Sequence, residues 1–221
     1  MMKISDNTFD VLKNFSSINQ SLAFKQGSTI RTVSEQKTIL AQAKVEESFP
    51  VDFAIYELNQ FLGLSSLFED ADFEFGANQV TLKEGTAKAN YTYADPSMIT
   101  TPPASNIDLP SVEVQFEMSK ANYRQIMNGA NQLGLPEIIV TNRDSKVSLV
   151  ATDTKNPLSN EFAISSDTDT NASFKFIFKI ENLKFIPNDY TLSISKSGIA
   201  HFKSDRVDYW VATESGSEYN S

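Results

Sequence analysis

The feature that most constrains the fold of this 221-residue chain is the similarity between two distant segments, which are called the first and the second echo below. "FAIYELNQFL" begins at Phe53 and "FIFKIENLKF" begins at Phe176, 123 residues later. Both segments run from an alternating, β-like pattern into a short helix-like pattern. An echo displaced by slightly more than half the chain predicts two copies of one domain. Chance similarity between two amphipathic segments is the alternative.

A proline-rich segment at residues 94–110 separates the two halves. It holds four of the eight prolines in the chain and shows no secondary-structure pattern. Proline removes a backbone donor and restricts the residue before it, so this segment is predicted to be a linker. We therefore expect an N-terminal domain at residues 1–108 and a C-terminal domain at residues 109–221.

Each half is predicted to begin with a capped helix or a strand leading into one, followed mainly by strands. Ser5 and Ser119 are the expected N-caps of helices over "SDNTFDVLKNFSSIN" and "SKANYRQIMNGANQL". Shorter helices are expected at "LNQFLGLSSLF" and in the second echo, and alternating apolar patterns predict strands elsewhere. The predicted fold class is α+β, with two similar β-rich domains that each contain two short helices.

The composition excludes several kinds of protein. The chain has no cysteine, which rules out disulfides and Cys-ligated zinc. No apolar run approaches the roughly 18 residues of a membrane-spanning helix, and the amino terminus lacks the apolar core of a signal peptide. The formal net charge of −9 argues against binding nucleic acid by bulk attraction, although it leaves room for a local basic surface.

Positive charge is set apart from acids around the first helix of each half. No Asp or Glu occurs at residues 11–34 or 118–136. On a helical wheel, the polar face of the later helix carries Arg124 and several amides, with Lys120 beside it. The earlier helix carries Lys13 next to two aspartates. These are either ordinary solvated faces or, taken together, surfaces facing one polyanionic partner.

The sequence contains no recognisable catalytic constellation. Its one histidine, His201, lies in a β-like stretch, and no nucleophile elbow, P-loop or dinucleotide-binding glycine motif is present. The predicted protein is therefore not an enzyme and needs no cofactor or metal. A hydrolase acting through clustered carboxylates is retained as a minor alternative, because acids are plentiful.

Several collinear stretches resemble one protein family. "MMKISDNTFDVLKNFSSIN", "VDFAIYELNQFLGLSSL" and "YADPSMI" are similar to segments of the sliding clamps of T-even-type bacteriophages, which are DNA polymerase processivity factors. The resemblance runs the full length and is weaker in the second half, where "FKFIFKIENLKFIPNDYTLSISKSG" keeps the order of features more than the letters. It implies a DNA-clamp fold, with two domains per chain, three chains per ring and helices lining the hole.

The resemblance also implies a function and partners. A clamp of this kind encircles double-stranded DNA as a homotrimer, independently of sequence, and tethers the replicative DNA polymerase. The implied further partners are a clamp-loader ATPase and late-transcription factors, in the cytoplasm of the infected bacterial host and without a membrane. The alternative function is that of a non-enzymatic, oligomeric virion or scaffold protein with the same duplicated domain.

Two sets of site residues follow from the clamp hypothesis. The cations expected to face DNA are Lys3, Lys13, Lys120, Arg124, Lys179 and Lys184. An apolar pocket for the peptide tails of partners is expected near the linker, from Met98, Ile99, Ile107, Leu109, Tyr209 and Trp210. The alternative for the linker residues is that they pin the linker to the domains.

Overall fold

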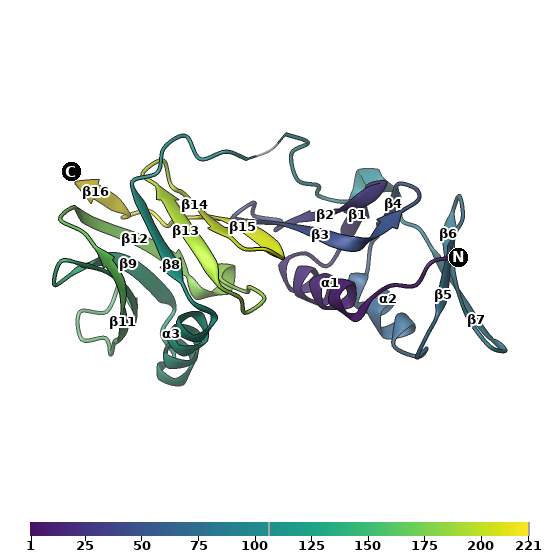
Figure 1. The fold of residues 1–221 in the computed structure, drawn as a ribbon, viewed down its shortest axis with the longest axis horizontal. Helices are drawn as coiled ribbons and strands as arrows, with labels where there is room; N and C mark the ends of the chain where they lie inside the picture. The colour runs from purple at the N-terminus through teal and green to yellow at the C-terminus, as the bar shows by residue number, and fades with distance from the viewer. Residues whose placement is uncertain (106, 221) are drawn as a thin grey trace. The chain divides into compact units, whose positions relative to one another are not determined.

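The computed structural model describes residues 1–105 and 107–220 and divides the chain into two compact units, Met1–Ala104 and Ser105–Ser221 (Figure 1). The division falls inside the proline-rich segment. Part of this segment is ordered as a 3-10 turn, η1 (Pro96–Met98), whose N-cap Asp95 accepts a hydrogen bond from the backbone of Ser97. The side chain of Arg31 donates to the carbonyl of Pro103 at 2.8 Å, which ties the segment to the first unit.

The first unit contains two α-helices and seven strands among its described residues. Its strands form antiparallel groups β1–β4, β2–β3 and β5–β6–β7. The elements are α1 (Asp6–Ile18), β1 (Leu22–Phe24), β2 (Gly27–Val33), β3 (Ile39–Phe49), β4 (Phe53–Ile55), α2 (Leu58–Ser65), β5 (Asp72–Phe75), β6 (Gln79–Glu84) and β7 (Ala87–Thr92).

The second unit packs one α-helix against two antiparallel sheet segments. The strand order is β11-β10-β9-β12-β16 in one and β15-β14-β13-β8 in the other. The elements are β8 (Val114–Met118), α3 (Lys120–Leu133), β9 (Glu137–Arg143), β10 (Lys146–Thr152), β11 (Phe162–Asp169), β12 (Ser173–Lys179), η2 (Ile180–Asn182), β13 (Tyr190–Ser195), β14 (Ile199–Lys203), β15 (Val207–Ala212) and β16 (Glu218–Asn220).

Aromatic side chains fill much of the core of each unit. In the first unit, Phe53 stacks on Phe24 at 4.2 Å between ring centroids and on Tyr93 at 5.0 Å. In the second unit, Phe185 stacks on Tyr209 at 4.2 Å and lies 4.7 Å from Phe202. Burial of such large rings supplies much of the hydrophobic stabilisation of a domain of this size.

The predicted fourth helix is wrong. The second echo does begin as a strand, β12, but it continues into the three-residue 3-10 turn η2 and then into irregular chain. The buried hydroxyl of Tyr123 donates to the carbonyls of Leu183 and Phe185, at 2.8 and 3.3 Å, and accepts the Phe185 N–H at 3.1 Å. These contacts engage backbone groups that a helix would need for itself. Among its described residues, the second unit therefore has one α-helix where the sequence predicted two.

The hydroxyl of Tyr123 keeps its proton at neutral pH. Burial raises the pKa of the Tyr123 hydroxyl to about 12, partly offset by its hydrogen bond with the backbone of Phe185. The hydroxyl thus stays protonated and able to donate at neutral pH. The hydrogen bonds between Tyr123 and the chain after β12 therefore do not depend on titration of this hydroxyl near neutral pH.

Two further structural observations bear on function. No helix in the described parts of the chain is long and apolar enough to cross a membrane. Across residues 1–105 and 107–220, no group of three or more His, Cys, Asp or Glu side chains is placed to hold a metal ion.

Candidate nucleic-acid interface

Helix α3 is positioned by contacts at both of its ends. At its start, the Ser119 side chain accepts the Asn122 N–H at 3.1 Å, and Asp189 accepts the Lys120 N–H at 2.6 Å. At its end, Gly134 adopts a left-handed conformation with φ of 64°, which favours glycine and stops the helix. One face buries Tyr123, Ile126 and Ala130 among other residues of the core.

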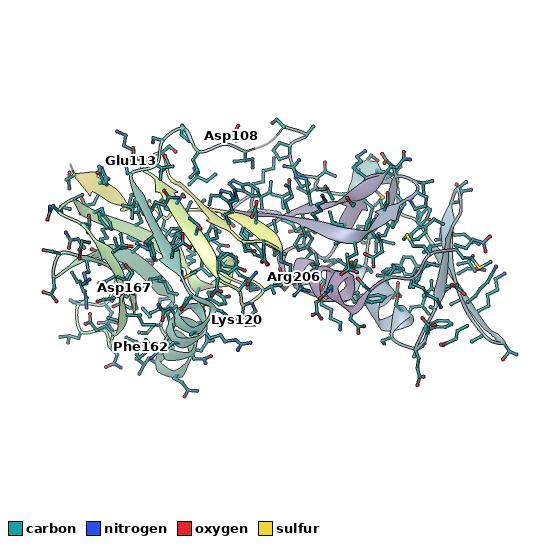
Figure 2. The ribbon with its side chains drawn as sticks, in the orientation of Figure 1. Asp108, Glu113, Lys120, Phe162, Asp167 and Arg206 are labelled. Carbon is teal, nitrogen blue, oxygen red and sulfur yellow. The ribbon has the colours of Figure 1, made fainter. Side chains whose placement is uncertain are left out.

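The opposite face of α3 is exposed, cationic and free of acids. The helix contains two basic residues and no Asp or Glu (Figure 2 labels Lys120 at its start). The exposed polar residues on the helix are Lys120, Arg124, Gln125, Asn128, Asn131 and Gln132. Every one of these side chains carries N–H groups that suit phosphate oxygens. We refer to these six residues below as the α3 polar face.

Helix α1 is positioned in a similar way but presents a different charge. The side chain of its N-cap Ser5 accepts the Thr8 N–H at 3.3 Å, and the Glu47 carboxylate of β3 accepts hydrogen bonds from the Ser5 backbone and the Thr8 hydroxyl. The helix buries Val11, Leu12 and Phe15, as its apolar stripe predicts. Its exposed residues include two aspartates as well as Lys13.

The Glu47 contact has a consequence for stability that depends on pH. Desolvation by partial burial acts to raise the pKa of Glu47, but the hydrogen bonds from Thr8 and Ser5 outweigh it and hold the pKa below its ordinary value of 4.5. A carboxylate with a depressed folded-state pKa contributes its full stability above its unfolded pKa. That contribution is lost as the pH falls through the folded pKa.

Replacing Glu47 with glutamine is expected to destabilise the first unit by about 1 kcal/mol at neutral pH. The difference in free energy of unfolding between wild type and variant stays constant above pH 4.5. It becomes smaller below that pH, because wild-type Glu47 becomes protonated there. Urea unfolding above and below that value measures the gap. The matched control is Glu46→Gln, an exposed neighbour that accepts from Asn7 at 3.2 Å, for which a smaller change is expected. An equal gap at both pH values would contradict the assignment.

The other predicted DNA-facing cations differ in their surroundings. Lys3 forms ion pairs with Asp70 at 3.0 Å and Asp72 at 3.5 Å, and the hydrogen bond to Asp70 is the main cause that raises the pKa of Lys3. Lys179 pairs with Glu214 at 3.2 Å. Lys184 is exposed just after η2. The charges of Lys3 and Lys179 are thus locally neutralised, which weakens their expected attraction for phosphate.

The residues expected to form a peptide pocket are spread between exposed and buried positions. Met98 is 67% exposed, whereas Ile99 is buried; Ile107 and Leu109 are half-buried. Trp210 is 9% exposed and stacks on His201 at 4.4 Å. For these residues the pocket stays a prediction.

Tyr209 is a correction to the expected pocket. Its side chain is fully buried, stacks on Phe185 and accepts the Ile186 N–H at 3.1 Å. Neighbouring residues of a strand point to opposite faces, so Tyr209 faces the core while Trp210 faces the other way. A side chain with no exposed surface cannot form the wall of a surface pocket, and Tyr209 is withdrawn from that role.

Comparison with known proteins gives consistent matches over nearly the whole chain. A family model described as "DNA polymerase processivity factor" matches residues 5–101, and one described as "gp45 sliding clamp, C terminal" matches residues 115–215. The sliding clamp of Vibrio phage KVP40 is 32% identical over 220 residues, covering 96% of this chain and 99% of that protein. The sliding clamp of Enterobacteria phage T4 is 28% identical over 230 residues, covering 99% of this chain and 100% of that protein.

Solved structures show the same fold at low sequence identity. PCNA of A. fulgidus, solved with the C-terminal region of FEN-1, has a TM-score of 0.73 at 12% identity and covers 99% of this chain and 100% of its own. The Helicobacter pylori beta clamp, solved with a DNA ligase peptide, has a TM-score of 0.71 at 12% identity and covers 97% of this chain and 65% of its own. These likenesses confirm the predicted α+β clamp fold, apart from the fourth helix.

Proposed function

Because this chain belongs to the sliding-clamp family of DNA polymerase processivity factors, we propose that it encircles duplex DNA as a homotrimeric ring and tethers the replicative DNA polymerase. The proposed action is topological and non-enzymatic. A closed ring keeps its place because the duplex cannot leave sideways, so tight binding to phosphate is unnecessary. A tethered polymerase returns to the primer end through its high effective concentration.

The observation that carries this proposal is the α3 polar face. In a chain with a net charge of −9, this helix exposes two cations and four amides without a carboxylate. Contacts from such groups to the DNA backbone are independent of sequence, and a few of them keep a duplex centred without stopping it from sliding. Acids elsewhere on the surface favour DNA at this face over other parts of the protein.

Strands at the ends of sheets support ring closure. In the described parts of the two units, β7 and β11 each end a sheet, as do β2, β8 and β16, whereas the outer edge of β5 is bridged by Met2. Exposed residues include Lys88 on β7 and Asp167 on β11; Figure 2 labels Asp167. Unpaired edges invite association, and opposite charges favour β7 of one copy pairing with β11 of the next. Three such contacts close a ring by rotation.

Further partners are part of the same proposal. A clamp-loader ATPase opens the ring, late-transcription factors bind it, and the protein acts in the cytoplasm of the infected bacterial host. The curated relatives named sliding clamps favour this function over the virion or scaffold alternative, which none of the matches supports.

The deciding experiment compares retention on circular and linear DNA. The protein is loaded onto nicked plasmid with its loader and ATP, freed from unbound protein, and the plasmid is then cut once. We expect loss from the cut DNA and retention on the circle, with retention restored when both ends of the cut DNA are blocked. Equal loss from both forms contradicts encirclement. Mass in solution provides an independent check, since three chains of 24.6 kDa give about 74 kDa.

A further inference from the structure

We propose that DNA contact within the ring is concentrated on α3, and that the helices of the first unit present a face that does not hold the duplex. This inference rests on the proposed function. It predicts three attracting helices in a trimer, one per chain, although the family fold places two similar units in each chain.

The first argument is the charge of the helices. Helix α3 carries two cations and no acid, whereas α1 carries Lys13 together with Asp6 and Asp10, and α2 has no charged residue at all. Asp10 and Lys13 lie three residues apart, which places them on neighbouring positions of one helix face. The distance between two side chains at this spacing is shorter than the Debye length of about 8 Å at physiological salt. A phosphate near Lys13 therefore also experiences the repulsion of Asp10.

The second argument is whether the polar groups are already engaged. Within residues 1–105 and 107–220, the six side chains of the α3 polar face form no hydrogen bond or ion pair with protein groups. On α1, the hydroxyls of Ser16 and Ser17 donate to the carbonyls of Lys13 and Asn14, at 2.8 and 2.7 Å, and Asn7 donates to Glu46. Donors on α3 are therefore available to a phosphate, whereas several on α1 are used within the protein.

Rigidity is a property that α3 shares with α1, which is held at its start by Ser5 and Glu47, so the difference between the two helices lies in their charge and in the engagement of their donors. The core contacts of Tyr123 and the Asp189 contact at the start of α3 hold the helix in place, so its donors meet a phosphate without reordering the backbone. Long side chains on a fixed helix reach different phosphates as the duplex advances. Such contacts are individually weak and exchange easily, which suits a sliding ring.

The experiment compares two charge reversals of the full-length protein, Arg124→Glu on α3 and Lys13→Glu on α1. Loader-dependent accumulation on nicked circular DNA is measured over a series of salt concentrations. Arg124→Glu is expected to lower accumulation by about fivefold or more and to reduce the salt slope by about 1 for each phosphate that position 124 no longer neutralises. Lys13→Glu is expected to stay within about twofold of wild type. The milder variant Arg124→Gln is expected to accumulate on DNA to a level between those of wild type and Arg124→Glu.

The outcomes separate this inference from the function on which it rests. Unchanged trimer mass and unfolding transitions show that the variants fold. Two results would contradict the proposal that DNA contact is concentrated on α3: equal loss of accumulation for the two reversals, or no effect of Arg124→Glu. If wild-type protein is still retained on circular DNA in that case, the proposed encirclement is unaffected. If wild-type protein is lost equally from circular and linear DNA, the proposed function itself fails.

Discussion

Replacing Phe185 with alanine is expected to lower the free energy of unfolding of the second unit by about 3 to 5 kcal/mol. Phe185 is buried and contacts four other aromatic rings, with centroid distances of 4.2 Å to Tyr209, 4.7 Å to Phe202, 5.8 Å to Tyr190 and 5.9 Å to Tyr123. Removing its ring leaves a cavity in the layer that joins the chain after β12 to α3. Both the transfer of apolar surface and the cavity contribute to the destabilisation.

Chemical unfolding followed by circular dichroism measures this destabilisation. Phe185→Leu is the matched control, because leucine keeps most of the apolar volume and is expected to cost clearly less than alanine. A second control, Leu67→Ala, removes an apolar side chain that is 77% exposed and is expected to change stability by less than about 0.5 kcal/mol. A change below about 1 kcal/mol for Phe185→Ala would show that the site collapses without a cavity and would contradict the packing described.

Replacing Gly129 with alanine is expected to destabilise the second unit by about 1 to 2 kcal/mol, although alanine is the better helix former. A Cβ at this position meets the Phe162 ring, with carbon atoms at 2.4, 2.5 and 2.9 Å. Figure 2 shows Phe162, at the start of β11, close to α3. The nearest atoms include the ring carbon attached to Cβ, so the whole Phe162 side chain must move.

Gly63 in α2 provides the matched control for this prediction. An added Cβ there meets no atom within 4 Å, and the residue is exposed. Gly63→Ala is therefore expected to stabilise the first unit by up to about 1 kcal/mol through helix propensity alone. Thermal unfolding of both variants gives the comparison. If Gly129→Ala stabilises the protein as Gly63→Ala does, the close contact with Phe162 is wrong.

A double-mutant cycle tests the Gly129–Phe162 contact directly. Once Phe162 is replaced by alanine, the clash with an alanine at position 129 disappears, so the cost of Gly129→Ala should fall or reverse sign. The contact also matters for the proposed ring, because Phe162 belongs to β11, the strand proposed to meet the neighbouring copy. A change at Gly129 is thus expected to weaken the trimer as well as the unit.

The sequence alone was sufficient for features that depend on local patterns. The N-caps Ser5 and Ser119 and the apolar stripes of α1 and α3 follow from residue types at fixed spacing, and both helices form as predicted. The acid-free character of α3 is likewise visible in the sequence. The collinear stretches were enough to identify the family, because they preserve the order of features along the chain.

Only the tertiary structure decided which side chains are exposed, which are buried and which are already paired with another group. The second echo reads as a strand entering a helix, yet Tyr123, about 60 residues earlier in the chain, binds its backbone and leaves only the turn η2. Alternation along β15 places Tyr209 and Trp210 on opposite faces of the strand, and Tyr209 is fully buried against Phe185. Lys3 and Lys179 look like available cations in the sequence, but folding brings carboxylates against both. Local patterns determine which elements form, whereas contacts between distant segments determine the environment of each side chain.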